Sequence, residues 1–398
     1  MSTHSTRKTS AKLGLILLAY IAFISLGLPD GLLGVAWPSI RADFSQPLDS
    51  LGFMLLAGMA GYLTSSFLSG QLMARLGVGG LLAASCAITG AGLIGYTLVP
   101  TWWMMVALGA VAGLGAGAID AGINTYIAAN HGEGLMQWLH ASFGIGVTLG
   151  PIIMTTGINQ FNTWRLGYVI VGTAQITLGL CFALTAKMWQ RADEGERTDE
   201  NQRLTDYKTS LGETLRQPRV WLSILMFFIY TGIELSLGHW AYTLLTESRG
   251  VDPEVAGLWA GSYWGTFTLG RILAGLYAQR LGGHAVLRFS MLAALLGAIL
   301  LWWAPVQIIG LLGVAVTGFA VAPIFPALVS GTSKRVGAHH AANTIGMQIG
   351  AAGLGGSILP GIAGVLARRI SLEVIPLYLI GLIVALLLLY GLTMRGRE

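Results

Sequence analysis

Hydrophobic residues recur along this chain in long windows, and polar residues gather in the short segments between them. Each window holds about 20 residues, the length at which an α-helix crosses a hydrocarbon core of about 30 Å. The pattern predicts an all-α integral membrane protein with twelve transmembrane helices, near residues 13–36, 50–72, 79–99, 102–128, 135–158, 165–187, 220–246, 254–279, 285–303, 306–333, 341–367 and 372–393.

The composition agrees with a membrane location, because 54% of the residues are hydrophobic and only 10% are charged, against about 25% charged in soluble proteins. The first window is too long for a cleaved signal and has no small-residue cleavage site, so we expect it to remain as a helix. Cys86 and Cys181 lie inside apolar windows. We expect two buried free thiols and no disulfide.

Lys and Arg residues are distributed unevenly between the two sides of the predicted membrane. The N-terminal side collects 17 of them and the opposite side five. This bias is typical of the positive-inside rule, so we expect both termini and the long central loop to be cytoplasmic. The net charge of +5 therefore describes topology, and we expect no nucleic-acid partner.

One long polar segment, residues 191–219, separates the sixth window from the seventh. Its charges are mixed and nearly balanced, which favours a solvated linker with a short surface helix at residues 207–216. We therefore expect an N-terminal six-helix bundle at residues 1–190, a cytoplasmic linker at 191–219 and a C-terminal six-helix bundle at 220–398.

The two halves repeat each other at an offset of 204 to 206 residues. "GQLMARLG" (70–77) aligns with "GLYAQRLG" (275–282), and Gly113 falls on Gly318. Asp30 of the first helix falls on Glu234 of the seventh. Several matches at nearly one offset favour a duplication, and hence two pseudo-symmetric bundles. The 56 glycines fit close helix packing in lipid, either static or sliding.

Asp30 lies in "ISLGLPDGLLGVAW" (24–37), where Pro29 and three glycines interrupt an otherwise apolar helix. A carboxylate near the bilayer centre costs roughly 3 kcal/mol on insertion scales, so it is rarely kept without a function or a polar neighbour. Pro29 and the glycines are expected to relax the helix around it. We predict that Asp30 faces the central pathway and exchanges a proton.

Asp120 lies in the fourth predicted helix, with Asn124 one turn further on the same face. His140 enters the fifth helix at a comparable depth. A carboxylate beside an imidazole can share and pass a proton, so we predict proton coupling through Asp120 and His140 and substrate binding by Asn124. A static hydrogen bond between the two helices is the alternative.

Glu234 lies near the middle of the seventh predicted helix. It is expected to bind substrate hydroxyls, to titrate, or to pair with Arg271. Aromatic rings beside amides and carboxylates suit a sugar, which offers a C–H face and a rim of hydroxyls. The predicted substrate-binding residues are therefore Asn124, Glu234, Gln348, Trp37, Trp240, Tyr263 and Trp264. Three arginines, Arg75, Arg280 and Arg271, are assigned gating or structural roles.

The sequence lacks the motifs that mark common enzyme classes. It contains no HExxH, no nucleophile elbow, no CxxC pair and no phosphate loop. We therefore expect no catalytic residues, no metal ligands and no cofactor, and consider a membrane-embedded enzyme the weakest interpretation.

"GLGAGAIDAGIN" followed by "LHASFGIG", together with the acid late in the first helix, resembles the fucose:proton symporter family of the major facilitator superfamily. The resemblance covers the twelve-helix plan. It implies that Asp30 and Asp120 take part in proton coupling and sugar recognition, and that Asn124 matches the family's asparagine. The sequence departs from the family pattern in having Asp in place of Glu at position 120 and His140 in place of a glutamine.

The leading hypothesis is proton-coupled symport of a sugar or related small polar solute by alternating access, with the proton gradient as energy source. The alternative is a proton-coupled exporter of drugs or lipids on the same fold. We expect a monomer that contacts membrane lipid in the bacterial cytoplasmic (inner) membrane. The identity of the substrate does not follow from the resemblance.

Overall fold

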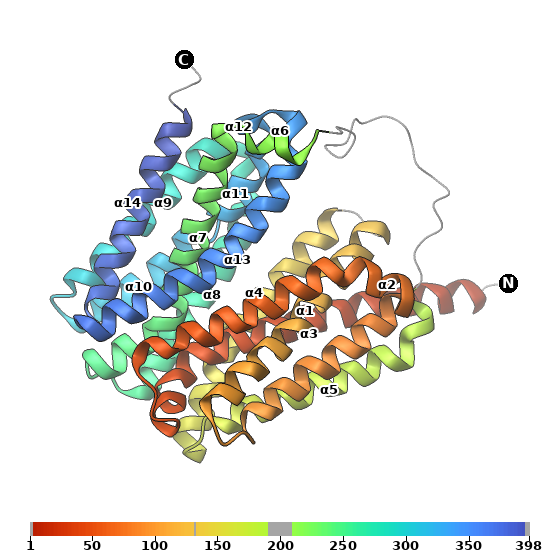
Figure 1. Cartoon of the computed structure of the whole chain (residues 1–398), viewed down its shortest axis with the longest axis horizontal. Helices are drawn as coiled ribbons and strands as arrows, with labels where there is room; N and C mark the ends of the chain where they lie inside the picture. The colour runs from red at the N-terminus through yellow and green to blue at the C-terminus, as the bar shows by residue number, and fades with distance from the viewer. Residues whose placement is uncertain (1–2, 131–132, 190–208, 395–398) are drawn as a thin grey trace. The chain divides into compact units, whose positions relative to one another are not determined.

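The structure is a computed structural model that describes residues 3–130, 133–189 and 209–394, and all its regular elements in these ranges are helices (Figure 1). The chain folds into two compact units. The first unit comprises Met1–Gln46 and Phe53–Glu196, and the second comprises Pro47–Gly52 and Arg197–Glu398. Residues 191–208 of the predicted linker lie outside the described residues.

The first unit holds the first six predicted spans in five helices. These are α1 (Thr3–Asp43), α2 (Leu51–Tyr96), α3 (Trp102–Asn130), α4 (Glu133–Phe161) and α5 (Arg165–Thr185), and α5 ends in the short 3₁₀ turn η2 (Ala186–Met188). One helix, α2, contains two spans, because its backbone leaves the helical region at Gly77 (φ 70°, ψ 170°). A buried core of apolar side chains joins α1, α2, α3 and α5, among them Phe23, Leu82, Ile119 and Phe182.

The second unit holds the last six spans. Its helices are α6 (Leu211–Leu215), α7 (Pro218–Thr243) with the π-turn η4 (Leu244–Ser248), α8 (Pro253–Leu281), α9 (Gly283–Trp303), α10 (Gln307–Val321), α11 (Ile324–Ser330), α12 (Thr332–Val336), α13 (Ala338–Arg369) and α14 (Val374–Met394). The 3₁₀ turn η1 (Leu48–Ser50) packs on α13 within this unit, where Arg368 pairs with Asp49 at 3.1 Å. The helix expected at residues 207–216 corresponds to α6.

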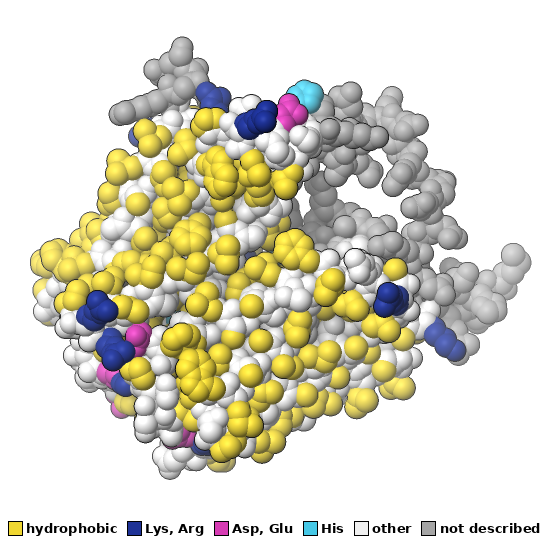
Figure 2. Space-filling view, viewed as in Figure 1, with side chains coloured by type: hydrophobic (Ala, Val, Ile, Leu, Met, Phe, Trp, Pro, Cys, Tyr) yellow, Lys and Arg dark blue, Asp and Glu magenta, His cyan; other side chains and the backbone are white. Residues whose placement is uncertain are grey.

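Ten described helices are long and apolar enough to cross a membrane. One of them, α2, accounts for two of the predicted spans. Helix α8 is not among the ten, because its polar residues lower its mean hydropathy. With α8 included, the helices correspond to the twelve predicted spans. Hydrophobic side chains are spread over the visible face of the protein (Figure 2), and Phe67 and Leu184 are 82% and 87% exposed. The surface is that of a protein solvated by lipid.

The helix around Asp30 differs from the sequence-based expectation. We expected the prolines and glycines to relax the helix, but α1 continues from Thr3 to Asp43 with Pro29 and Pro38 inside it. Gly27 and Gly31 instead lie against the backbone of α4, at the carbonyl oxygens of Phe143 and Val147, and α1 and α4 run side by side. These glycines serve close packing, which any side chain would prevent.

The internal repeat is visible in the backbone of both units. Gly113 on α3 lies against the carbonyl oxygen of Gly58 on α2, and Gly318 on α10 lies against that of Tyr263 on α8. Both members of the second pair follow the first by 205 residues. Gly77 and Gly282, also paired by the repeat, both have positive φ, of 70° and 77°. The two units therefore share the positions of close helix–helix contact and of the positive-φ glycines between consecutive spans.

The two cysteines are free, as expected, but their burial differs. Cys86 is buried and Cys181 is half-buried. The prediction of two buried thiols is wrong for Cys181, because an apolar window in a membrane helix also has a lipid-facing side.

Candidate functional site

Asp120 on α3 is the centre of a hydrogen-bonded cluster in the first unit. The Tyr62 hydroxyl of α2 donates to Asp120 Oδ2 at 2.6 Å. The Asn124 side-chain amide donates to Asp120 Oδ1 at 2.9 Å and to the Asp120 backbone oxygen at 3.0 Å. Both carboxylate oxygens thus accept a hydrogen bond, an arrangement that suits an ionised carboxylate.

Two further titratable side chains lie around this cluster. His140 on α4 is exposed, packs edge-on against Phe23 of α1 with ring centroids 5.6 Å apart, and lies within electrostatic range of Asp120. Asp30 on α1 is also exposed and lies within electrostatic range of Tyr62. The structure therefore gathers Asp30, Asp120 and His140 in one region of the first unit. Their role in proton coupling stays a prediction.

Glu234 on α7 and Arg271 on α8 form the charged centre of the second unit. They lie within electrostatic range of each other, but no ion pair within 4.0 Å joins them in the part of the chain that the structure describes. Arg271 stacks over the Phe267 ring at 4.3 Å, and its Nε atom is buried without a hydrogen-bond partner among the described residues. A buried donor of this kind is available to a ligand.

Two tyrosines enclose Glu234. The Tyr263 hydroxyl donates to the Glu234 backbone oxygen at 2.7 Å, and the Tyr230 hydroxyl donates to the Val321 backbone oxygen at 3.1 Å. Tyr230 also lies within electrostatic range of the Glu234 carboxylate. Sequence reasoning identified Tyr263 but not Tyr230, which lies one turn before Glu234 and shares its face of α7.

Four predicted substrate-binding side chains lie in packed interiors. Trp37 and Trp240 have no exposed surface, and the Trp240 indole donates to the Pro360 backbone oxygen at 2.9 Å. Trp264 packs on Tyr263, with ring centroids 4.9 Å apart. Gln348 is buried, donates to Ser223 Oγ at 2.7 Å and accepts from Thr332 Oγ1 at 3.1 Å. The hydrogen bonds of Trp240 and Gln348 join different helices, whereas the Trp264–Tyr263 contact lies within α8. Substrate binding by these residues stays a prediction.

Two of the arginines assigned to gating, Arg75 and Arg280, are exposed. Each precedes by two residues the glycine with positive φ, Gly77 or Gly282, at which the chain passes from one span to the next. Their equivalent positions fit the repeat. A gating role for either arginine stays a prediction.

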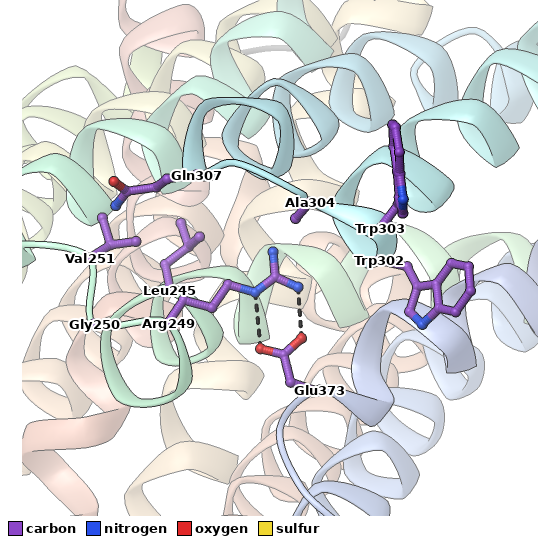
Figure 3. A pocket seen from close by; sticks show the side chains of 9 residues that line it. All are labelled: Leu245, Arg249, Gly250, Val251, Trp302, Trp303, Ala304, Gln307 and Glu373. Carbon is purple, nitrogen blue, oxygen red and sulfur yellow. Dashed lines mark hydrogen bonds and ion pairs between the residues drawn. The ribbon is translucent and has the colours of Figure 1, made fainter.

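A separate cavity of about 490 Å³ lies in the second unit between the end of α7 and the loops that join α9 to α10 and α13 to α14 (Figure 3). Arg249 makes a bidentate ion pair there with Glu373, at 3.0 Å from Nε to Oε1 and 2.7 Å from Nη2 to Oε2. Arg249 Nη2 also donates to the Leu301 backbone oxygen at 2.8 Å. The hydrogen bond from Arg249 holds the pKa of the Glu373 carboxyl below its ordinary value. Arg249 thereby ties the segment that follows η4 to the last turn of α9 and to the loop between α13 and α14.

Sequence reasoning missed Tyr62 and the Arg249–Glu373 pair. Tyr62 belongs to a run of polar and small residues, "YLTSSFLSGQ" (62–71), that stands out inside an apolar span. That run is the signal that could have identified it. No comparable signal links Arg249 to Glu373, which are 124 residues apart. The described residues contain no group of three or more His, Cys, Asp or Glu side chains that could hold a metal ion.

Comparison with known proteins gives relatives named as sugar transporters. The human sodium-dependent glucose transporter 1 is 24% identical over 386 residues, which cover 87% of this chain and 72% of that protein. The glucose/mannose transporter GlcP of Bacillus subtilis is 20% identical over 320 residues, covering 79% of this chain and 78% of that protein.

Solved structures of transporters share the fold. The nucleoside transporter NupG superposes with a TM-score of 0.77 at 16% identity, covering 95% of this chain and 98% of the other. The E. coli fucose:proton symporter FucP superposes with a TM-score of 0.62 at 14% identity, covering 93% and 97%. At these identities the likeness concerns the fold.

The model of the Major Facilitator Superfamily matches residues 19–360, and again 240–398. These two matches span most of the chain. With the twelve helices, the repeated halves and the transporter fold, they identify this multi-pass membrane protein as a member of the Major Facilitator Superfamily.

Proposed function

We propose that this protein is a proton-coupled symporter that imports a sugar or a related small polar solute by alternating access of its two halves. The hydrogen-bonded carboxylate of Asp120, with His140 and Asp30 in the same region, is the observation that carries the proposal. A membrane-embedded cluster with two carboxylates and an imidazole can take up and release a proton near neutral pH.

The proposed substrate class rests on the relatives and on the second unit. Both relatives described above are named as sugar transporters. Glu234 can accept from a sugar hydroxyl, and the unpartnered Nε of Arg271 can donate to one. Because these two side chains make no direct ion pair within the described residues, a ligand hydroxyl can lie between them.

The charged groups around Asp120 and around Glu234 differ, and we infer different roles for the two units from this difference. Arginine remains charged at any physiological pH, so Arg271 fixes the charge balance around Glu234. The Asp120 cluster has no such fixed cation among the described residues, and its neighbour His140 carries an imidazole, a group whose unperturbed pKa lies near neutrality. We therefore assign proton exchange to the first unit and substrate binding to the second.

The decisive experiment is uptake of radiolabelled glucose, mannose and fucose into proteoliposomes under an imposed pH gradient, inside alkaline. Accumulation above the external concentration is expected for at least one sugar, and it should collapse when the pH gradient is dissipated. Because one relative is named sodium-dependent, the matched control imposes a sodium gradient at equal pH. Accumulation driven by sodium alone would overturn the proton coupling.

Asp30→Asn tests the coupling itself. The variant should lose uphill accumulation by at least tenfold while retaining sugar counterflow, because the substitution removes a proton-binding carboxylate and leaves the proposed ligand-binding residues of the second unit in place. A variant that still concentrates sugar against its gradient would make Asp30 a structural residue. Outward transport of amphipathic drugs or lipids, without sugar uptake, would favour the exporter.

A further inference from the structure

The hydroxyl of Tyr62 is the hydrogen-bond donor that binds Asp120 from a different helix. Its donor atom lies on α2 and its acceptor on α3, and the two residues are 58 positions apart. The other side-chain donor, Asn124, lies on α3 itself and is additionally fixed by its bond to the Asp120 backbone oxygen. Of these two donors to Asp120, one belongs to its own helix and the other depends on the packing of α2 against α3.

These two donors respond differently when Asp120 binds a proton. An amide NH₂ group only donates, so Asn124 keeps Oδ1 as an acceptor whether or not the carboxyl is protonated. A phenol can both donate and accept. A proton that arrives on Asp120 Oδ2 must donate outward, and the Tyr62 oxygen at 2.6 Å is positioned to accept it once the phenolic hydrogen turns away.

Titratable groups from two further helices lie within electrostatic range of this hydrogen-bonded pair. Asp30 of α1 lies within electrostatic range of Tyr62, and His140 of α4 lies within electrostatic range of Asp120. When the phenolic hydrogen turns away from Asp120, the carboxylate of Asp30 is the charged group in range that favours the reoriented hydroxyl. Tyr62 therefore interacts with both carboxylates assigned to proton coupling, through a hydrogen bond to Asp120 and electrostatically with Asp30.

The internal repeat shows that this polar pair is not required by the helix contact. At the offset of 205 residues, Tyr62 falls on Phe267 and Asp120 falls on Phe325. The α2–α3 contact through Gly58 and Gly113 is nevertheless reproduced by Tyr263 and Gly318. The second unit makes the same glycine contact with phenylalanines at these two positions, so the glycine contact by itself does not require the hydroxyl and the carboxylate.

We propose that Tyr62 is a positioning residue for proton coupling: its hydroxyl holds Asp120 ionised and must reverse from donor to acceptor when Asp120 binds the proton. This inference rests on the proposed function. In the coupled step, the proton forms a bond to Asp120 Oδ2, the hydrogen bond from the phenol breaks, and the Tyr62 O–H bond itself stays intact. No phenolate forms and no other reactant is needed.

Tyr62→Phe is the test, because it removes the hydroxyl, keeps the ring and reproduces the residue type of the second unit. The variant should still exchange sugar by counterflow. The midpoint of the pH profile of proton-driven uptake should move to higher pH by about one unit, because loss of the hydrogen bond from Tyr62 destabilises the ionised form of Asp120. A shift of about one unit corresponds to a roughly tenfold change in the protonation equilibrium.

The matched control is Tyr96→Phe, which removes a buried hydroxyl from the same helix. Tyr96 is 6% exposed and packs against Tyr168. The pH profile of uptake by the Tyr96→Phe variant should match that of the wild type. In an Asp120→Asn background, where sugar counterflow is the measurable activity, Tyr62→Phe should not change the pH dependence of counterflow, because Tyr62 acts through Asp120. A thermal melt of each variant separates loss of folding from loss of coupling.

Two results would overturn the inference, and they differ from failure of the proposed function. If the profile of Tyr62→Phe overlays the wild type while Asp30→Asn abolishes accumulation, Tyr62 is structural and the proton coupling stands. If Tyr62→Phe changes the pH dependence of counterflow in the Asp120→Asn background, Tyr62 acts on another group. If the wild type itself shows no proton-driven uptake, the proposed function fails.

Discussion

The two halves share their helix contacts and differ in the chemistry placed on them. The contact of Gly113 with Gly58 in the first unit recurs as Gly318 with Tyr263 in the second. The first unit places Tyr62 and Asp120 beside this contact, whereas the second places Phe267 and Phe325 at the equivalent positions.

The charged side chains of the second unit, Glu234 and Arg271, lie at other positions of the repeat than Tyr62 and Asp120. Glu234 matches Asp30 in the repeat, but Arg271 falls on Ser66 of the first unit, so only the second unit has a membrane-embedded arginine at this position. A fixed cation beside a carboxylate restricts its titration, whereas a carboxylate beside an imidazole can exchange a proton near neutral pH. The duplicated scaffold thus provides one half for proton exchange and the other for ligand binding in our proposal.

The largest expected effect tests the shared packing. Gly113→Ala and Gly318→Ala should each destabilise the protein by about 1 to 3 kcal/mol, because the new Cβ collides with a backbone carbonyl that cannot move away. The melting temperature in detergent is the measurement, and both variants should fall by a similar amount.

Gly70→Ala and Gly275→Ala are the controls for this comparison. They are paired by the same repeat, and a Cβ at either position meets open space. Both should be neutral or slightly stabilising, since alanine favours a helix by up to about 1 kcal/mol over glycine. Equal losses at all four positions would show that the helix contact is not the cause.

The second effect concerns the charged centre of the second unit. Glu234→Gln should raise the sugar concentration for half-maximal uptake by about tenfold, which corresponds to loss of roughly one charge-assisted hydrogen bond to the ligand. The pH profile should stay unchanged, in contrast to Asp30→Asn. Unaltered affinity together with a lost pH dependence would exchange the roles assigned to the two halves.

A smaller effect is expected at the imidazole of the first unit. His140→Gln removes the titrating ring and keeps a hydrogen-bonding amide, so transport should survive while its pH optimum moves by less than about one unit. The pH dependence of uptake from about pH 5 to 8 is the measurement. A profile that overlays the wild type over this range would make His140 a structural neighbour of Phe23 and Asp120.

The smallest effect lies outside both centres, at Glu373. The carboxyl is 43% exposed and its Arg249 partner 16%, so the ion pair contributes at most about 1 kcal/mol. Because the folded-state pKa of Glu373 lies below its ordinary value of 4.5, this stabilisation is present above about pH 4.5 and is lost as the pH falls through the folded-state pKa.

Melting temperatures of Glu373→Gln and wild type should therefore differ by about 2 °C at pH 7 and converge in acid. Glu254→Gln, which replaces an exposed acid in the first turn of α8, serves as the control. A difference that persists unchanged into acid would exclude the ion pair as its cause.

The sequence alone determined the positions of the apolar spans, the duplication and the positions of the acidic residues. Span length and hydropathy are local properties imposed by the bilayer, and a repeat is a direct comparison of residues, so neither requires three-dimensional contacts. Asp120 and Asn124 could also be paired from sequence, because residues four apart share a helix face.

The tertiary structure alone decided which side chains face each other across helices. Tyr62 and Asp120 are 58 residues apart, and Arg249 and Glu373 are 124 apart, so no periodicity connects them. The sequence could not predict that Trp37, Trp240 and Gln348 are buried, because an aromatic or amide side chain in an apolar span suits both a ligand site and a helix contact. Which face of each helix meets another helix is set by the packing of close-contact glycines such as Gly113 and Gly318, and that packing exists only in the folded chain.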